Sequence, residues 1–119
     1  MKVLISSNSC WNIFNFRLKI IKELIKKNYE IIIVAPEDEY KSKILSLGCK
    51  YIPIKLNPTS QNIILDISYI QILYNIIKKE KPDYFLPFTS KPNIYGSFIC
   101  SFFNTKTINT ITGMGSPFI

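Results

Sequence analysis

The chain has 119 residues, of which 47% are hydrophobic and 19% are charged. This length and composition predict one packed domain, since the chain is too short for two cores and too apolar for a disordered protein. The formal charge of +7 indicates either solvated lysine-rich helix faces or a surface for an anionic partner. The sequence lacks an RNP, helix-turn-helix or zinc pattern, so it excludes nucleic acid and leaves a membrane surface or a phosphorylated ligand.

The first two predicted elements are a buried strand and an amphipathic helix. Residues 2–6 form a short apolar run bounded by polar residues, which is typical of a buried strand. The helix ends at Asn28 and carries its lysines on the face opposite the apolar one. Its apolar positions, at spacings of three and four, are Ile13, Phe16, Ile20 and Leu24.

Two strands and a short helix follow. The β-branched run over residues 29–36 predicts the clearest strand of the chain. A short helix over residues 38–47 ends at Gly48, which can cap it. The strand over residues 50–54 contains Pro53, and a proline inside a strand indicates a position at the edge of the sheet.

The second half of the chain repeats this alternation. After a polar loop, a long helix over residues 64–79 has its apolar positions at Ile67, Ile70, Tyr74 and Ile77. A strand over 82–88 precedes a helix over 93–103, which we expect to be largely buried because it carries few charges, and residues 106–111 form a fifth strand. Five strands alternating with four helices predict an α/β, Rossmann-like three-layer sandwich with a parallel sheet.

The three cysteines, Cys10, Cys49 and Cys100, are widely spaced and form no C-x-x-C pair. They fit neither a disulfide framework nor a zinc site, so we expect reduced, buried thiols and no metal. The N-terminal apolar run is too short for a signal peptide, and no stretch approaches the roughly 18 uncharged residues of a membrane span. The sequence therefore predicts a cytoplasmic protein, with a peripheral position on the inner membrane face left open.

Ligands of open parallel sheets bind at the carboxyl ends of the strands, where we expect three loops of this chain. The first loop lacks the G-x-G-x-x-G fingerprint, which excludes a nicotinamide-dependent dehydrogenase. It also lacks the acidic pair of a receiver domain. The chain has no histidine, which excludes Ser–His and Cys–His catalysis. The loops therefore predict binding chemistry, and no catalytic residue can be named.

The first loop carries one aromatic ring and several polar side chains, namely Asn8, Trp11, Asn12 and Arg17. An aromatic plate with amide groups suits stacking on a sugar and hydrogen bonding to it. The same residues also fit a structural role, in which Trp11 plugs the end of the sheet and the asparagines form turns and a helix cap. Both interpretations remain open.

The second loop, "TSKPNIYGS", predicts an anion-tolerant helix entrance. Pro92 is pre-organised for the first helical turn, and Thr89 or Ser90 can cap the helix. Lys91 adds a positive charge there, so its replacement is expected to weaken ligand binding at little cost in melting temperature. Gly96 is expected to let the helix pack closely on the sheet. The alternative is a purely structural cap with packing glycines.

Several segments together resemble the N-terminal half of the first domain of family 4 glycosyltransferases, above all those of bacterial capsular and O-antigen polysaccharide synthesis. The segments are "WNIFNFR", "IIIVAPEDEY", "GCKYIPI", "KPDYFLPFTSKPNIYGS" and "INTITGMGSPF". The match runs over the whole chain in the right order. Its K-P-N-x-Y-G and I-T-G-x-G-S parts are fairly specific, whereas the rest is a general Rossmann pattern.

The resemblance implies a GT-B enzyme with two facing Rossmann-like domains. In that family the first domain holds the acceptor, often a lipid-linked (polyprenyl-diphosphate) saccharide at the cytoplasmic membrane face. The second domain holds a nucleotide-sugar donor, and transfer proceeds with retention and without a metal or other cofactor. The resemblance places the three loops along the cleft, with substrate-binding candidates Asn8, Trp11, Asn12, Arg17, Thr89, Ser90, Lys91, Asn93, Tyr95, Thr112, Gly113, Gly115 and Ser116.

The chain departs from the family where the donor-gripping E-x-x-x-x-x-x-x-E segment has no counterpart. We therefore expect residues 1–119 to be a single, incomplete N-terminal domain that cannot transfer sugar unaided, whether as a truncated gene, a fragment or half of a split enzyme. One alternative is a non-catalytic module that recruits a separate catalytic chain to the membrane. Another is a fragment similar to a UDP-sugar 2-epimerase, although that class would carry catalytic carboxylates and histidine.

Overall fold

The computed structural model describes residues 1–57, 59 and 63–109 of the chain. Its strands are β1 (Lys2–Ser6), β2 (Glu30–Ala35), β3 (Lys50–Pro53), β4 (Tyr84–Pro87) and β5 (Lys106–Thr107). Its helices are α1 (Cys10–Phe16), α2 (Leu18–Lys26), α3 (Lys41–Leu45), α4 (Ile63–Glu80), the π-helix η1 (Pro92–Gly96) and α5 (Ser97–Cys100). Each of the five predicted strands is present.

The strands form one parallel sheet in the order β3-β2-β1-β4-β5. In the central strand, Leu4 lies opposite Ile32 of β2 and Phe85 of β4. β3 is an edge strand, as Pro53 predicted, because a proline cannot donate a ladder hydrogen bond. The predicted α/β class with a parallel sheet is confirmed.

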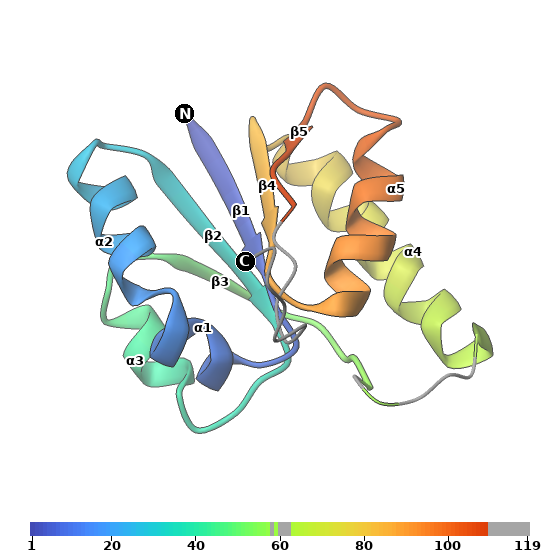
Figure 1. Ribbon diagram of the computed structural model, residues 1–119, viewed down its shortest axis with the longest axis horizontal. Helices are drawn as coiled ribbons and strands as arrows, with labels where there is room; N and C mark the ends of the chain where they lie inside the picture. The colour runs from blue at the N-terminus through green and yellow to red at the C-terminus, as the bar shows by residue number, and fades with distance from the viewer. Residues whose placement is uncertain (58, 60–62, 110–119) are drawn as a thin grey trace, which may run out of the picture.

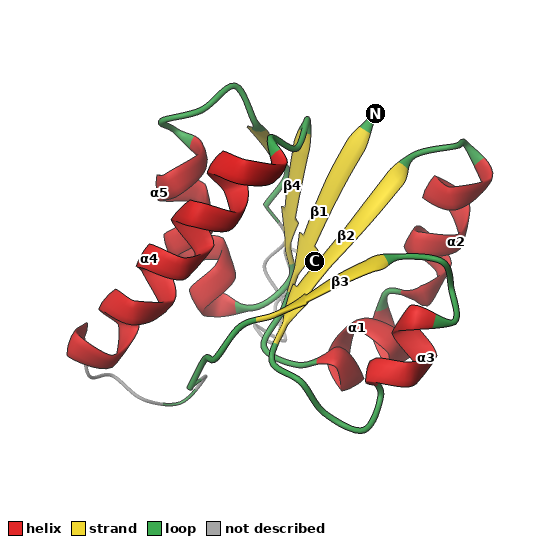
Figure 2. Cartoon of the chain, turned by 180° about the vertical axis from the view of Figure 1, so that it is seen from behind, coloured by secondary structure: helices red, strands yellow, loops and turns green. Residues whose placement is uncertain are grey.

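Helices cover both faces of the sheet, with α1, α2 and α3 on one side and α4 and α5 on the other (Figures 1 and 2). Successive strand residues point to opposite faces, so two cores form. Val3 packs with Ile13 on the side of the first three helices. Leu4 packs with Leu73 and Ile99 on the side of α4 and α5. This core, packed on both faces of the sheet, fixes the strands whose carboxyl ends carry the predicted ligand-binding loops.

The predicted first helix is divided at Arg17 into α1 and α2. The break changes which positions face the sheet: Ile13 and Ile21 are fully buried, whereas Phe16 is 60% exposed and Ile20 is 38% exposed. The expectation that Phe16 and Ile20 belong to the apolar face is therefore wrong. The prediction assumed one continuous helix, but the backbone of Arg17 leaves the helical region, so the spacing of buried residues changes there.

The apolar face predicted for the long helix is confirmed only in part: Ile77 is fully buried and Ile70 packs against the core, whereas Tyr74 is 37% exposed. In α4 the residues that face the core are Asp66, Tyr69, Leu73 and Ile77, at spacings of three, four and four. Ile67 is 55% exposed, although it was expected to be inside. Isoleucine occurs on nearly every side of this helix, so hydrophobicity alone does not identify the buried face.

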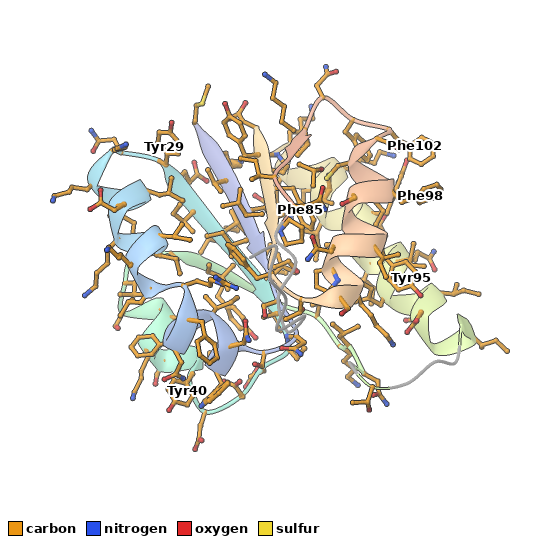
Figure 3. All side chains as sticks on the ribbon, viewed as in Figure 1. Tyr29, Tyr40, Phe85, Tyr95, Phe98 and Phe102 are labelled. Carbon is orange, nitrogen blue, oxygen red and sulfur yellow. The ribbon has the colours of Figure 1, made fainter. Side chains whose placement is uncertain are left out.

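The helical segment after β4 is less buried than its composition predicted. Ile94, Phe98 and Phe102 expose between 63% and 64% of their surface, and Figure 3 shows Phe98 and Phe102 pointing away from the sheet. The expected close approach of Gly96 is confirmed, since a Cβ there would overlap the ring of Phe85. This helix therefore touches the sheet through its glycine and exposes large side chains on its outer side.

The cysteines are all free and buried, as the sequence predicted. Asn28 and Gly48 end the predicted helices with left-handed backbone, at φ of 66° and 88°. Among the described residues, no helix is long and apolar enough to cross a membrane. Within the same residues, no group of three metal-ligating side chains comes together.

Candidate functional site

The first two predicted loops meet at the carboxyl ends of β1 and β4, whereas the third, residues 112–118, lies outside the described residues. The carboxyl ends of β1 and β4 lie at the lower end of the sheet in Figure 1, where α1 begins and where the helical segment of η1 and α5 starts. Phe88, just after β4, donates its backbone N–H to Ser6 at the end of β1. The residues that the sequence assigned to separate loops are thus neighbours in space.

The first loop is fixed by a network of short polar contacts. Ser9 caps α1, accepting the Asn12 N–H at 3.0 Å. Ser7, which is buried, donates its hydroxyl to the Asn12 side-chain oxygen at 2.8 Å. The Asn12 amide is therefore held by the loop itself. Asn8 is half-buried beside it.

Trp11 does not plug the end of the sheet, which is one of the two roles predicted for it. Its side chain is 45% exposed, and its ring meets Phe16 edge-to-face with 5.4 Å between the centroids. Its backbone N–H donates to the Asp38 carboxylate at 2.9 Å. The ring is therefore available on the surface, whereas the backbone fixes the start of α1.

A groove of about 810 Å³ lies next to this aromatic pair, on α1 and α2. Phe16 forms part of its apolar lining, and Lys19, Lys22 and Lys26 contribute charge. We call Trp11, Phe16, Lys19, Lys22 and Lys26 together the basic aromatic surface. Its one acidic lining residue is Glu23.

Arg17 lies where α1 ends and α2 begins. Its guanidinium carbon is 4.3 Å from the centre of the Phe88 ring, a cation–π distance. Burial lowers the pKa of the Arg17 guanidinium from its ordinary value. The side chain thus joins the first loop to the end of β4.

The second loop has the helix entrance that its proline predicted. Pro92 is buried at the first position of η1. Thr89 does not cap the helix, because its hydroxyl oxygen is buried without a hydrogen-bond partner among the described residues. Ser90 is exposed, and no side chain caps η1. The predicted cap by Thr89 or Ser90 is therefore wrong.

Lys91 forms a buried ion pair that the sequence did not reveal. Its ammonium donates to the Asp66 carboxylate at 2.8 Å and to the backbone oxygen of Asn57 at 2.6 Å. Tyr95 donates its hydroxyl to the other Asp66 oxygen at 2.7 Å. The hydrogen bonds from Lys91 and Tyr95 lower the pKa of Asp66, and the same bond to Asp66 raises the pKa of Tyr95.

This network changes the interpretation of the second loop. Lys91 already has a carboxylate partner, so its charge is not free for an anion, and its replacement would leave Asp66 buried without a cation. The expected low cost in melting temperature does not agree with this arrangement. Asp66 had a sequence signal of its own, because it lies one helical turn before Tyr69 on the buried face of α4. A pocket of about 350 Å³ borders the pair.

Asn93 joins the second loop to the segment that follows β5. Its side-chain amide donates to the backbone oxygen of Thr89 at 2.9 Å. Asn109, which follows β5, donates to the Asn93 side-chain oxygen at 3.0 Å and to the Ser97 hydroxyl at 2.6 Å. All four candidates of the third loop, Thr112, Gly113, Gly115 and Ser116, lie outside the described residues.

Comparison with known proteins decides the family. The model of the family described as "Glycosyl transferase 4-like" matches residues 2–119. The chain belongs to this family. The glycosyltransferase resemblance inferred from the sequence motifs is thereby confirmed.

One curated relative is the N,N'-diacetylbacillosaminyl-diphospho-undecaprenol alpha-1,3-N-acetylgalactosaminyltransferase of Campylobacter jejuni. It is 28% identical to this glycosyl transferase 4-like chain over 96 residues, which are 81% of the chain. The chain spans about a quarter of that relative's length (26%). By its name, the relative acts on a diphospho-undecaprenol saccharide.

Two solved structures share the fold. A glycosyltransferase from Rickettsia africae superposes with a TM-score of 0.73 at 14% identity, over 91% of this chain and 29% of its own. The glycosyltransferase VinC, solved with dTDP, gives a TM-score of 0.69 at 11% identity, over 97% of this chain and 35% of its own. At such low identity the likeness establishes the fold alone.

Proposed function

We propose that this chain supplies the acceptor-side half of a glycosyltransferase that moves a sugar from a nucleotide-sugar to a lipid-linked saccharide. Family membership over residues 2–119 carries the proposal. The relative that acts on a diphospho-undecaprenol saccharide supports a lipid-linked acceptor. The loops at the carboxyl ends of β1 and β4 are where open parallel sheets bind ligands.

Surface polysaccharide synthesis, as in a capsule or an O-antigen, is the process that we propose for this activity. A lipid-linked acceptor requires the enzyme to work at a membrane, and we propose a peripheral position on its cytoplasmic side. The basic aromatic surface supports this position. Exposed aromatic rings beside lysines are typical of helices that lie in the membrane interface, where anionic lipids attract the lysines.

Reconstitution tests the proposal. The chain is mixed with a separately produced donor-binding domain of the same family, and transfer of a labelled sugar from a nucleotide-sugar to a polyprenyl-diphosphate saccharide is measured. Transfer is expected only when both polypeptides are present, with each alone as the control. Acceptor binding without transfer, with every donor domain tried, would instead support a non-catalytic recruitment module.

A further inference from the structure

Arg17 is the only arginine among the 15 basic residues of the chain, the others being lysines. Arginine differs from lysine in its planar fork of N–H donors, which matches the oxygens of a phosphate two at a time. The chain therefore has this recognition geometry at one position only. That position is the junction of α1 and α2, at the carboxyl end of the sheet.

The backbone at this junction fixes where the side chain goes. Arg17 has φ −123° and ψ 9°, so its residue leaves the helical region. Its N–H still donates to Ile13 of α1 at 2.8 Å, and its carbonyl accepts the Ile21 N–H of α2 at 3.1 Å. Both helices thus hold the backbone of Arg17, and its guanidinium lies over the Phe88 ring.

The guanidinium has no anionic partner in the described part of the chain. Other basic side chains near the sheet do: Lys91 pairs with Asp66, and Lys50 pairs with Glu80. Arg17 Nε is buried without an acceptor among the described residues, and burial is the cause that lowers its pKa. Taking a cation partly out of water without a counter-ion is unfavourable, and an incoming anion would offset that cost.

The surroundings of Arg17 suit a phosphate group. Phe88, whose ring the guanidinium covers, follows β4, precedes Thr89 in the chain and donates its backbone N–H to Ser6 of β1. The Thr89 hydroxyl is a second polar group without a partner in the described residues.

We propose that Arg17, held against Phe88, binds the diphosphate group of the lipid-linked acceptor. The identity of the ligand rests on the proposed function, whereas the anion site rests on the geometry of Arg17. A diphosphate ester also occurs in a nucleotide-sugar, so the test must distinguish the two sources.

Titration calorimetry with inorganic pyrophosphate tests the site on the 119-residue chain. We expect saturable binding by the unchanged chain and a loss of about tenfold or more in affinity for Arg17→Gln. Lys27→Gln removes an exposed charge ten residues away, outside the basic aromatic surface, and should stay within about twofold, because an exposed lysine contributes only a screened, long-range attraction. Equal affinity of Arg17→Gln and the unchanged chain, or no binding by the unchanged chain, would overturn the proposal.

Circular dichroism checks that each variant is folded. If Arg17→Gln does not fold, Arg17→Lys keeps the charge and removes the fork, and it should weaken binding by about threefold or more. Farnesyl diphosphate is expected to bind more tightly than UDP, and the reverse order would overturn the assignment to the acceptor. Pyrophosphate binding requires no donor domain. The binding result therefore stands even if the transfer assay fails, and the two failures can be told apart.

Discussion

Lys91 and Asp66, which lie 25 residues apart in the chain, form an ion pair with 2.8 Å between the ammonium nitrogen and a carboxylate oxygen. The exposed fractions of the two side chains are 11% and 5%. The pair ties the start of the η1 segment to α4, and Lys91 also holds the backbone of Asn57. The segment that the sequence singled out for ligand binding is thus fixed to α4 and to the backbone at Asn57 through the side chain of Lys91.

Replacing Lys91 should lower the free energy of unfolding substantially. Lys91→Met leaves the Asp66 carboxylate buried without its cation, and breaking a buried pair in this way costs about 3 kcal/mol or more. Urea unfolding followed by circular dichroism measures the loss. The matched control is Lys41→Met, whose pair with Glu37 is exposed (42% and 57%) and should contribute less than about 1 kcal/mol. Equal losses in both variants would contradict the buried pair.

Stability should fall in acid because of two carboxylates. Lys91 and Tyr95 lower the pKa of Asp66, and Lys50 lowers the pKa of Glu80. The unfolded chain therefore binds more protons than the folded one, so these groups stabilise the fold fully above about pH 5 and lose their contribution as the pH falls below about 4. Melting temperatures between pH 7 and pH 3 measure this. Asp66→Asn should flatten the acid part of the curve, and an unchanged slope would exclude Asp66 as a source.

Gly96→Ala should destabilise the fold, since its Cβ would overlap the buried ring of Phe85. Overpacking of this kind costs about 1–3 kcal/mol. Thermal unfolding measures the cost, and a smaller residue at Phe85 should recover part of it in the double variant Gly96→Ala/Phe85→Leu. Strictly additive losses in the double variant would show that the two positions do not clash.

The three thiols should react slowly in the native state. Cys10, Cys49 and Cys100 are buried, and burial raises the pKa of Cys49 to about 11. Because the thiolate is the reactive form, a disulfide reagent at pH 8 is expected to label them only as the chain unfolds. The rate should follow the concentration of urea. Rapid labelling of one thiol without urea would contradict its burial.

The basic aromatic surface should carry membrane binding. Trp11→Ser/Phe16→Ser is expected to weaken co-sedimentation with anionic phosphatidylglycerol vesicles, because it removes the exposed rings of this surface. The control is Phe98→Ser/Phe102→Ser, which removes another exposed pair of rings in edge-to-face contact. It should bind like the unchanged chain, and equal losses in both variants would contradict a specific surface.

The lysines of the same surface allow a second comparison. Lys19→Gln/Lys22→Gln/Lys26→Gln should reduce binding to anionic vesicles and its salt dependence, since each lysine near such a surface contributes about 1 kcal/mol. The exposed lysines at the end of α4 provide the control as Lys78→Gln/Lys79→Gln/Lys81→Gln, with the same change in net charge. If both triple variants lose the same affinity, net charge alone explains the attraction.

The order of strands and helices could be predicted from the sequence, because period and chain order reflect local preferences. Pro53 marked an edge strand and Gly96 marked a close approach, because the missing N–H of proline and the missing side chain of glycine are properties of the residue itself. The faces of the helices were harder to predict. The break at Arg17 turned Phe16 outward, and this break depends on how α1 and α2 pack on the sheet.

The candidate site was predictable only in part. Parallel strands bring their carboxyl ends to one edge, so the meeting of the loops followed from the fold class. The contacts between particular residues of the site did not follow from the fold class. Asp66 and Lys91, or Arg17 and Phe88, are far apart in the chain, and their contacts depend on the three-dimensional packing of separate elements.

The two outer strands differ in their capacity to recruit another strand. At Pro53, β3 has a position without an N–H, which discourages a further strand from pairing there. β5 contains no proline and pairs with β4 through Lys106 and Thr107. A further strand is therefore expected at the β5 edge of the sheet and not at the β3 edge. A polypeptide that enlarges it, from the same molecule or another, is expected to join beside β5, next to the loops that carry Asn93 and Asn109.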